Sequence, residues 1–227
     1  MDESSWDAVF WDIGGVIVSL ESVRRGHEAF VEALCERYLC TVPREMAIER
    51  WRDVVSEYFT ERDEMAFRPA REGYDRGVRA IVAESVPPAE WRPLFDDVME
   101  RMVVANDGAI PTLEALFERR FHVGVVSDVD HREGRRILES FELFDGFDSY
   151  TTSEAIGKTK PHPAMFETAL EKADVVPERS LMIGDRYEND IRGAKDVGMK
   201  TVAYGAENGD DVDYRITHLE EILDIID

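Results

Sequence analysis

Strand-like and helix-like patterns alternate along the second half of the chain. Short apolar runs occur there at residues 121–127, 148–152, 180–184 and 200–204. Segments with a helical spacing of apolar positions lie around them, at 112–120, 131–142, 162–174, 189–197 and 218–226. A further buried strand is predicted at 6–12. This alternation is typical of a parallel sheet with helices on both faces, so we predict an α/β fold with a doubly wound parallel sheet.

The stretch that follows the first strand has a different pattern, with helical periodicity and no strand signal. It predicts four helices, which start near Leu20, at Pro43, near Asp75 and at Ala89. We therefore predict an α/β core domain formed by residues 1–18 and 106–227, and an α-helical domain inserted between them at 19–105.

Composition limits the possible partners. The chain has 227 residues, 44% of them hydrophobic, and a formal net charge of −22. So large a negative charge repels nucleic acid and anionic membrane surfaces. No apolar run reaches the roughly 18 residues of a membrane span, and the acidic start lacks the features of a signal peptide. We expect a soluble cytoplasmic protein, a monomer or homodimer, with neither nucleic-acid nor membrane partners.

Lysine is scarce, with five lysines against 22 arginines. Abundant carboxylates with few lysines resemble proteins of salt-loving archaea, so we hypothesise a halophilic protein. Unfolding curves in low and in molar KCl test this, and equal stability in both would contradict it. Cys35 and Cys40 are the two cysteines, and both fall in a predicted helix. Their spacing of five places them on different helix faces, so we expect reduced, buried thiols.

Three predicted strands end in polar residues. Asp12 closes an apolar run and is followed by Ile13-Gly14-Gly15, Ser127 ends the second run, and Asp185 follows Gly184. A carboxylate at the end of a strand, followed by a glycine turn, is a common way to present a nucleophile at the carboxyl edge of a parallel sheet.

Together with Lys160-Pro161 and with Asn189-Asp190, these segments resemble, in order, the four motifs of the haloacid dehalogenase (HAD) superfamily. The resemblance spans residues 8 to 194. Most members are Mg²⁺-dependent phosphatases, and the inserted helical domain corresponds to the cap that covers the active site. The resemblance implies hydrolysis of a small phosphate monoester.

The resemblance also implies a role for each motif residue. Asp12 is the nucleophile that forms an aspartyl-phosphate, and Asp12, Asp185, Asp190 and the carbonyl of Gly14 bind Mg²⁺. An all-oxygen ligand set suits that ion. Asn189 supports the metal site. The phosphoryl group is bound by a set that comprises Gly15, Ser127, the amide of Asp128, and Lys160.

One position departs from the family pattern. Phosphatases of the superfamily usually carry a second Asp two residues after the nucleophile, and this chain has Gly14. That Asp acts as general acid and base, which is worth about 10²–10⁴-fold in rate. The enzyme could be slow, or another group could substitute. The candidates are Asp128, Asp130, His131 and His27.

Gly14 leaves two other functions open. A 2-haloacid dehalogenase displaces halide, which leaves without protonation, but such an enzyme needs no metal cluster. A non-catalytic phosphate-binding protein would retain ligand affinity after Asp12→Asn. We favour the phosphatase because the carboxylate cluster and Lys160 are both present.

Five arginines of the predicted helical domain fall within 18 residues, and they are Arg62, Arg68, Arg71, Arg76 and Arg79. They could bind an anionic substrate group, but we favour ion pairs with nearby acidic residues. Trp51, Tyr74 and His122 are interpreted as structural.

Overall fold

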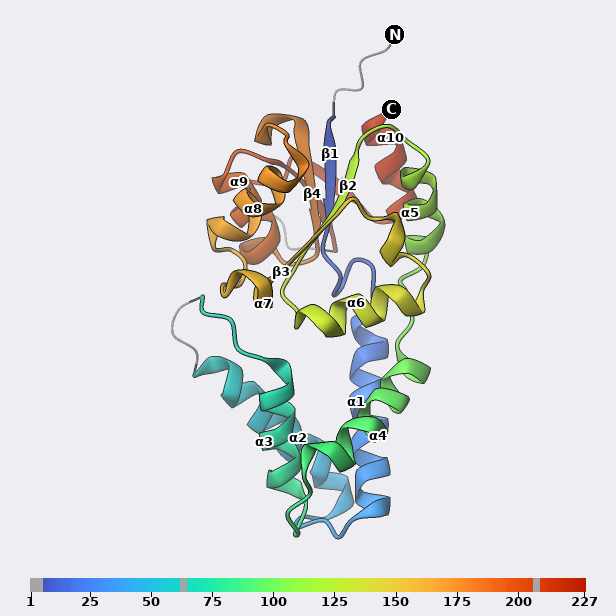
Figure 1. The fold of residues 1–227 in the computed structure, drawn as a ribbon, viewed down its shortest axis with the longest axis vertical. Helices are drawn as coiled ribbons and strands as arrows, with labels where there is room; N and C mark the ends of the chain where they lie inside the picture. The colour runs from blue at the N-terminus through green and yellow to red at the C-terminus, as the bar shows by residue number, and fades with distance from the viewer. Residues whose placement is uncertain (1–5, 62–64, 206–208) are drawn as a thin grey trace. The chain divides into compact units, whose positions relative to one another are not determined.

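The computed structural model describes residues 6–61, 65–205 and 209–227. The chain forms two compact units. One consists of Met1–Ser19 and Ala105–Asp227, and the other of Leu20–Val104. We refer to them as the α/β unit and the helical unit. Their elements are drawn in Figure 1.

The α/β unit contains one sheet of six parallel strands in the order β3-β2-β1-β4-β5-β6. This confirms the predicted fold class. The strands are β1 (Ala8–Trp11), β2 (His122–Ser127), β3 (Ser149–Thr152), β4 (Ser180–Gly184), β5 (Lys200–Tyr204) and β6 (Tyr214–Ile216). Strand β6 was not predicted because two of its three residues are exposed, so it shows no apolar run.

Helices cover both faces of this sheet (Figure 1), with α8 and α9 on one side and α5 and α10 on the other. On the first side, Phe166 of α8 packs with Phe10 and Val126 in one buried apolar cluster. The helices are α5 (Ala109–Phe117), α6 (His131–Ser140), α7 (Ser153–Ile156), α8 (Pro163–Ala173), α9 (Gly193–Asp196) and α10 (Ile222–Ile226), with 3-10 turns η1 (Phe144–Gly146), η2 (Pro177–Arg179) and η4 (Leu219–Glu221) and a π-helix η3 (Tyr187–Arg192). His122 is structural, since its Nε2 lies 2.7 Å from Ser149 Oγ.

The register aligns the carboxyl ends of the central strands. Trp11, the last residue of β1, lies opposite Val125 of β2 and Ile183 of β4. The three strands therefore end within about two residues of one another along the sheet. Residues that follow them are brought to one edge.

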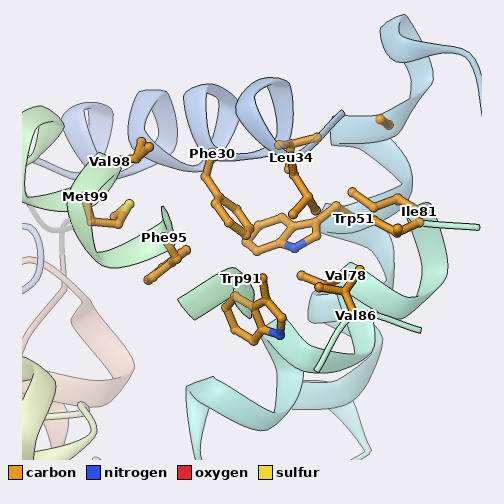
Figure 2. Packing of buried hydrophobic residues seen from close by; sticks show 13 residues of the cluster. Phe30, Leu34, Trp51, Val78, Ile81, Val86, Trp91, Phe95, Val98 and Met99 are labelled. Carbon is orange, nitrogen blue, oxygen red and sulfur yellow. The ribbon is translucent and has the colours of Figure 1, made fainter. Parts of the chain in front are cut away.

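The helical unit consists of α1 (Leu20–Arg37), α2 (Arg44–Thr60), α3 (Ala70–Ile81) and α4 (Pro88–Met102). Large buried aromatic side chains hold them together (Figure 2), among them Phe30, Trp51, Trp91 and Phe95. Tyr74 stacks on Trp51 with ring centroids 5.4 Å apart. Trp51 and Tyr74 thus belong to the core of this unit. Among the described residues, no helix is long and apolar enough to cross a membrane.

The prediction of two free cysteines is wrong, because Cys35 and Cys40 form a disulfide. Helix α1 ends at Arg37, so Cys40 lies beyond the helix and helix-face geometry does not apply to the pair. The chain reverses after α1, and Cys40 forms a β-bridge with Val82. Their Cα atoms lie 5.5 Å apart, within the range that a disulfide spans.

Three of the five clustered arginines of the helical unit form ion pairs, as expected. Arg68 and Arg76 both pair with Glu61, at 3.5 and 2.9 Å, and both guanidinium groups lie over the Tyr58 ring. Arg79 pairs with Asp75. Arg71 lies in α3, and Arg62 lies outside the described residues. The three paired arginines are therefore engaged by acidic neighbours of their own unit.

Candidate active site

The polar residues predicted at the strand ends lie together in the α/β unit. Asp12 follows β1, Ser127 is the last residue of β2 and Asp185 follows β4. Asp12 and Ser127 are both 2% exposed, and Asp190 in η3 is fully buried. Burying polar groups to this extent is costly unless other polar groups satisfy them.

Lys160 lies at the centre of the cluster. It is fully buried, and it precedes a cis peptide bond to Pro161. Its Nζ donates to the Val126 carbonyl at 3.0 Å and lies 3.0 Å from Asp12 Oδ1 and 2.6 Å from Asp190 Oδ1. Burial disfavours its charge, but the carboxylates outweigh burial and raise the pKa of Lys160. Lys160 is therefore a buried cation held between two carboxylates and a backbone carbonyl.

Asp12, Asp185 and Asp190 form a group of carboxylates that could hold a metal ion. One carboxylate oxygen of each lies within 4.8 Å of the others. Burial is the main cause that raises the pKa of Asp185 to about 6, and the charges of Asp12 and Asp190 add to it. Burial also raises the pKa of Asp12, against the attraction of Lys160. Asp185 Oδ1 is buried without a hydrogen-bond partner. A divalent cation would give that oxygen a partner and relieve the repulsion, and three carboxylates suit Mg²⁺.

The loop after β1 passes close to this group. Gly15 has φ of +85°, and a Cβ there would lie 2.0 Å from Asp185 Oδ2. Only glycine combines this backbone with so close an approach. Gly14, just before it, does not adopt a left-handed φ. The loop therefore brings the backbone of Gly14 and Gly15 beside the carboxylates with no side chain at residue 14.

Asn106 fixes this loop and was not predicted. Its Nδ2 donates to the carbonyls of Gly15 and Val16, at 2.8 and 2.9 Å. Its backbone N–H donates to Ile17 at 2.8 Å. In the sequence, Asn106 begins an Asn-Asp-Gly turn signal before α5, which indicates a turn but not its partner.

Asp128 links two of the motifs. Its Oδ1 accepts from the backbone N–H of Lys160 at 2.8 Å, and its Oδ2 accepts from Arg186 Nη2 at 3.1 Å. Asn189 Nδ2 donates to the Lys160 carbonyl at 3.0 Å. The backbone N–H of Arg186 donates to Asp190 Oδ2 at 2.9 Å. Arg186 is the second residue missed in the sequence, where its position directly after Asp185 was the available signal.

Two of the groups considered as replacements for the missing acid already have polar partners. Both oxygens of Asp128 accept hydrogen bonds, and His131 Nδ1 lies 3.0 Å from Thr152 Oγ1. Asp130 is the N-cap residue of α6 and is 7% exposed. His27 packs between aromatic rings of the helical unit, and burial lowers its pKa to about 4, so it is neutral at pH 7.

Metal binding through Asp185 would depend on pH. With its folded pKa at about 6 and an ordinary value of 3.8, the folded protein retains a proton that the unfolded chain loses between these values. Without metal, Asp185 therefore destabilises the fold as the pH rises from about 4 through 6. A cation that needs the ionised carboxylate then binds more weakly below pH 6. We expect the rise in melting temperature caused by Mg²⁺ to be largest near pH 7.5 and to fall below about pH 6.

Thermal unfolding with and without Mg²⁺ across this range measures the effect. Asp185→Asn is the control, since in this variant the rise in melting temperature caused by Mg²⁺ should no longer depend on pH in this range. A Mg²⁺ effect that stayed constant from about pH 5 to 8 would contradict the assignment of Asp185 as a ligand.

Comparison with known proteins shows which family the chain resembles. A family model for haloacid dehalogenase-like hydrolases matches residues 6–198. The glyceraldehyde 3-phosphate phosphatase of Pyrococcus furiosus is 38% identical over 129 residues, which are 53% of this chain and 53% of that protein. The chain thus matches about half the length of this relative.

Solved structures share the fold over nearly the whole chain. A HAD phosphatase from Thermococcus onnurineus has a TM-score of 0.73 and 25% identity, and the match covers 96% of this chain and 97% of that one. A 2-haloacid dehalogenase from Pseudomonas syringae has a TM-score of 0.69 and 23% identity over 97% of each chain, which shows the fold alone. With the family model matched over residues 6–198 of 227, the chain belongs to the haloacid dehalogenase-like hydrolase family.

Proposed function

We propose that this protein hydrolyses a small phosphate monoester through a phosphorylated Asp12, with Mg²⁺ as cofactor. The observation that carries the proposal is the buried cluster in which Lys160 lies between Asp12 and Asp190 while Asp185 keeps an unpartnered buried oxygen. Burial first, and the repulsion from Asp12 and Asp190 second, raise the pKa of Asp185 and oppose folding. A metal-free displacement has no need of three adjacent carboxylates kept at this cost.

Each residue has a task in this reaction. Asp12 attacks phosphorus, and Lys160, 3.0 Å away, favours its ionised form and orients it. Ser127 and the amide of Asp128 lie at the end of β2, where they would donate to phosphoryl oxygens. Asp12, Asp185, Asp190 and the Gly14 carbonyl would hold Mg²⁺, which neutralises phosphoryl charge in such sites. Water then attacks the phosphoaspartate, releasing phosphate and regenerating Asp12.

The helical unit would be the cap that selects the substrate. One relative is a glyceraldehyde 3-phosphate phosphatase, which supports a small phosphorylated compound as the substrate class. Arg68, Arg76 and Arg79 form ion pairs within the unit, which does not support a role for them in binding an anionic substrate. Arg71→Ala, assayed on neutral and anionic esters, tests the remaining arginine described in this cluster.

The test compares two substrates in molar KCl. We expect p-nitrophenyl phosphate to release phosphate with Mg²⁺ and not with EDTA, and 2-chloropropionate to form no lactate under either condition. Lactate formation without Mg²⁺ would instead establish a dehalogenase. Phosphate binding with neither activity would establish a binding protein.

A further inference from the structure

We propose that Arg186 stabilises the negative charge on the leaving-group oxygen of the ester, where the family's second Asp would supply a proton. This inference rests on the proposed phosphatase function. It concerns a residue that follows the metal-binding motif and whose guanidinium lies next to the catalytic cluster.

Two contacts fix Arg186 beside the cluster. Its Nη2 donates to Asp128 Oδ2 at 3.1 Å, and its backbone N–H donates to Asp190 Oδ2 at 2.9 Å. Its positive charge is close enough to act on Asp12, Asp185 and Lys160. Asp128 is in turn fixed by the backbone of Lys160, so the guanidinium is tied to the same framework as the nucleophile.

Exposure distinguishes Arg186 from Lys160. The Lys160 side chain is 0% exposed and that of Asp12 is 3% exposed, whereas the Arg186 side chain is 47% exposed. The Nζ of Lys160 donates to the Val126 carbonyl and lies 3.0 Å from Asp12 Oδ1 and 2.6 Å from Asp190 Oδ1. Lys160 can therefore steady the buried nucleophile, but its own burial keeps it away from an oxygen on the solvent side. Arg186 has five N–H groups, and the bond to Asp128 uses only one of them.

The geometry of phosphoryl transfer places the leaving oxygen on that solvent side. The attacking and leaving oxygens lie roughly in line through phosphorus. Asp12 attacks from the buried floor of the site, so the leaving oxygen points away from it, outward. A bond forms between Asp12 Oδ and phosphorus as the ester P–O bond breaks. The electron pair stays on the leaving oxygen, which departs as an oxyanion and takes a proton from solvent, while Arg186 remains protonated.

Leaving-group dependence tests this role. We would measure kcat/KM, which reports the phosphorylation step, for phenyl phosphates whose leaving groups range from 4-nitrophenol to unsubstituted phenol. For Arg186→Gln we expect a loss on the order of 10²-fold with phenyl phosphate, the cost of one oxyanion donor. The loss with 4-nitrophenyl phosphate should be several-fold smaller, because that oxyanion is already stable. Arg186→Lys should recover part of the activity.

Arg192→Gln is the matched control. Arg192 lies in the same segment, is exposed and pairs with Glu188 at 3.1 Å, so its replacement removes an equal charge nearby. We expect it to leave the leaving-group dependence unchanged. Circular dichroism and melting temperature confirm that the variants are folded.

The outcomes separate the two proposals. If wild type hydrolyses the esters and Arg186→Gln loses activity equally for all leaving groups, or loses none, the role of Arg186 is overturned and the phosphatase stands. If wild type with Mg²⁺ hydrolyses no ester, the proposed function is wrong, and the role of Arg186, which depends on it, is wrong too.

Discussion

Asp12→Asn is expected to reduce Mg²⁺-dependent phosphate release about 10⁴–10⁶-fold, the range in which removal of a covalent nucleophile falls. An amide cannot form the acyl phosphate, and it also removes one carboxylate from the metal site. The substitution keeps the shape of a side chain that is 2% exposed, so no cavity is made. The assay is initial rate with p-nitrophenyl phosphate at saturating Mg²⁺.

The same substitution should leave the fold intact. Burial raises the pKa of Asp12, so its ionised form is held at a cost, and Asn removes both this cost and the repulsion from Asp185 and Asp190. The lost attraction to Lys160 acts in the opposite direction. We therefore expect a change in melting temperature within about 5 °C, equivalent to roughly 1–2 kcal/mol.

Asp7→Asn is the control for Asp12→Asn. Asp7 lies just before β1, at the end opposite Asp12, and its carboxylate pairs with Arg179 at 2.7 Å in an exposed position. This variant should retain full activity, since exposed pairs contribute little. Retention of more than about one-hundredth of the activity in Asp12→Asn, with Asp7→Asn unaffected, would contradict Asp12 as the nucleophile.

The sequence predicted the sheet because its central strands are buried on both faces. All residues of β1 and β4 are buried, so these strands appear as continuous apolar runs that contrast with the helices between them. Parallel pairing then brings the following residues to one edge. Strand β6 has exposed Tyr214 and Arg215, and pairing with β5 rather than its own pattern makes it a strand.

The end of α1 could not be predicted because tertiary contacts determine it. No Gly or Pro lies between Arg37 and Cys40, so the local sequence carries no stop signal. The chain turns there because it pairs with the segment after α3, through Thr41 N–H to Ile81 and Ala83 N–H to Leu39. The disulfide depends on this pairing of segments about 40 residues apart.

At the site, motif spacing predicted the polar residues at the strand ends. It did not predict the hydrogen bonds that the loops make with one another. Asp128 was expected to bind substrate through its amide, but its side chain also connects Lys160 to Arg186. Asn106 holds the loop of Gly15, although it follows the inserted helical segment and lies about 90 residues later in the sequence. Such contacts depend on how loops approach one another, which residue type and spacing do not specify.

Gly14→Asp is expected to increase kcat/KM for phenyl phosphate on the order of 10²-fold, the lower end of general acid–base catalysis. The new carboxyl would stand two residues after the nucleophile, beside Asp12 and Asp185, whose charges would raise its pKa and keep it protonated more often. Unlike Gly15, Gly14 has no left-handed φ, so a side chain there does not strain the backbone. The gain with 4-nitrophenyl phosphate should be small, because that leaving group needs no proton.

Gly14→Asn is the control of equal size, and it should give no gain because an amide supplies no proton. An equal gain in Gly14→Asn, or no gain in Gly14→Asp, would mean that leaving-group protonation does not limit this enzyme.

Combining Gly14→Asp with Arg186→Gln connects the two residues in a double-mutant cycle. If Arg186 stabilises an oxyanion that departs without a proton, a proton supplied at residue 14 removes that charge. The loss caused by Arg186→Gln on phenyl phosphate should then be several-fold smaller in the Gly14→Asp background than in wild type. Strictly additive effects would show that Arg186 and residue 14 act on different atoms of the substrate.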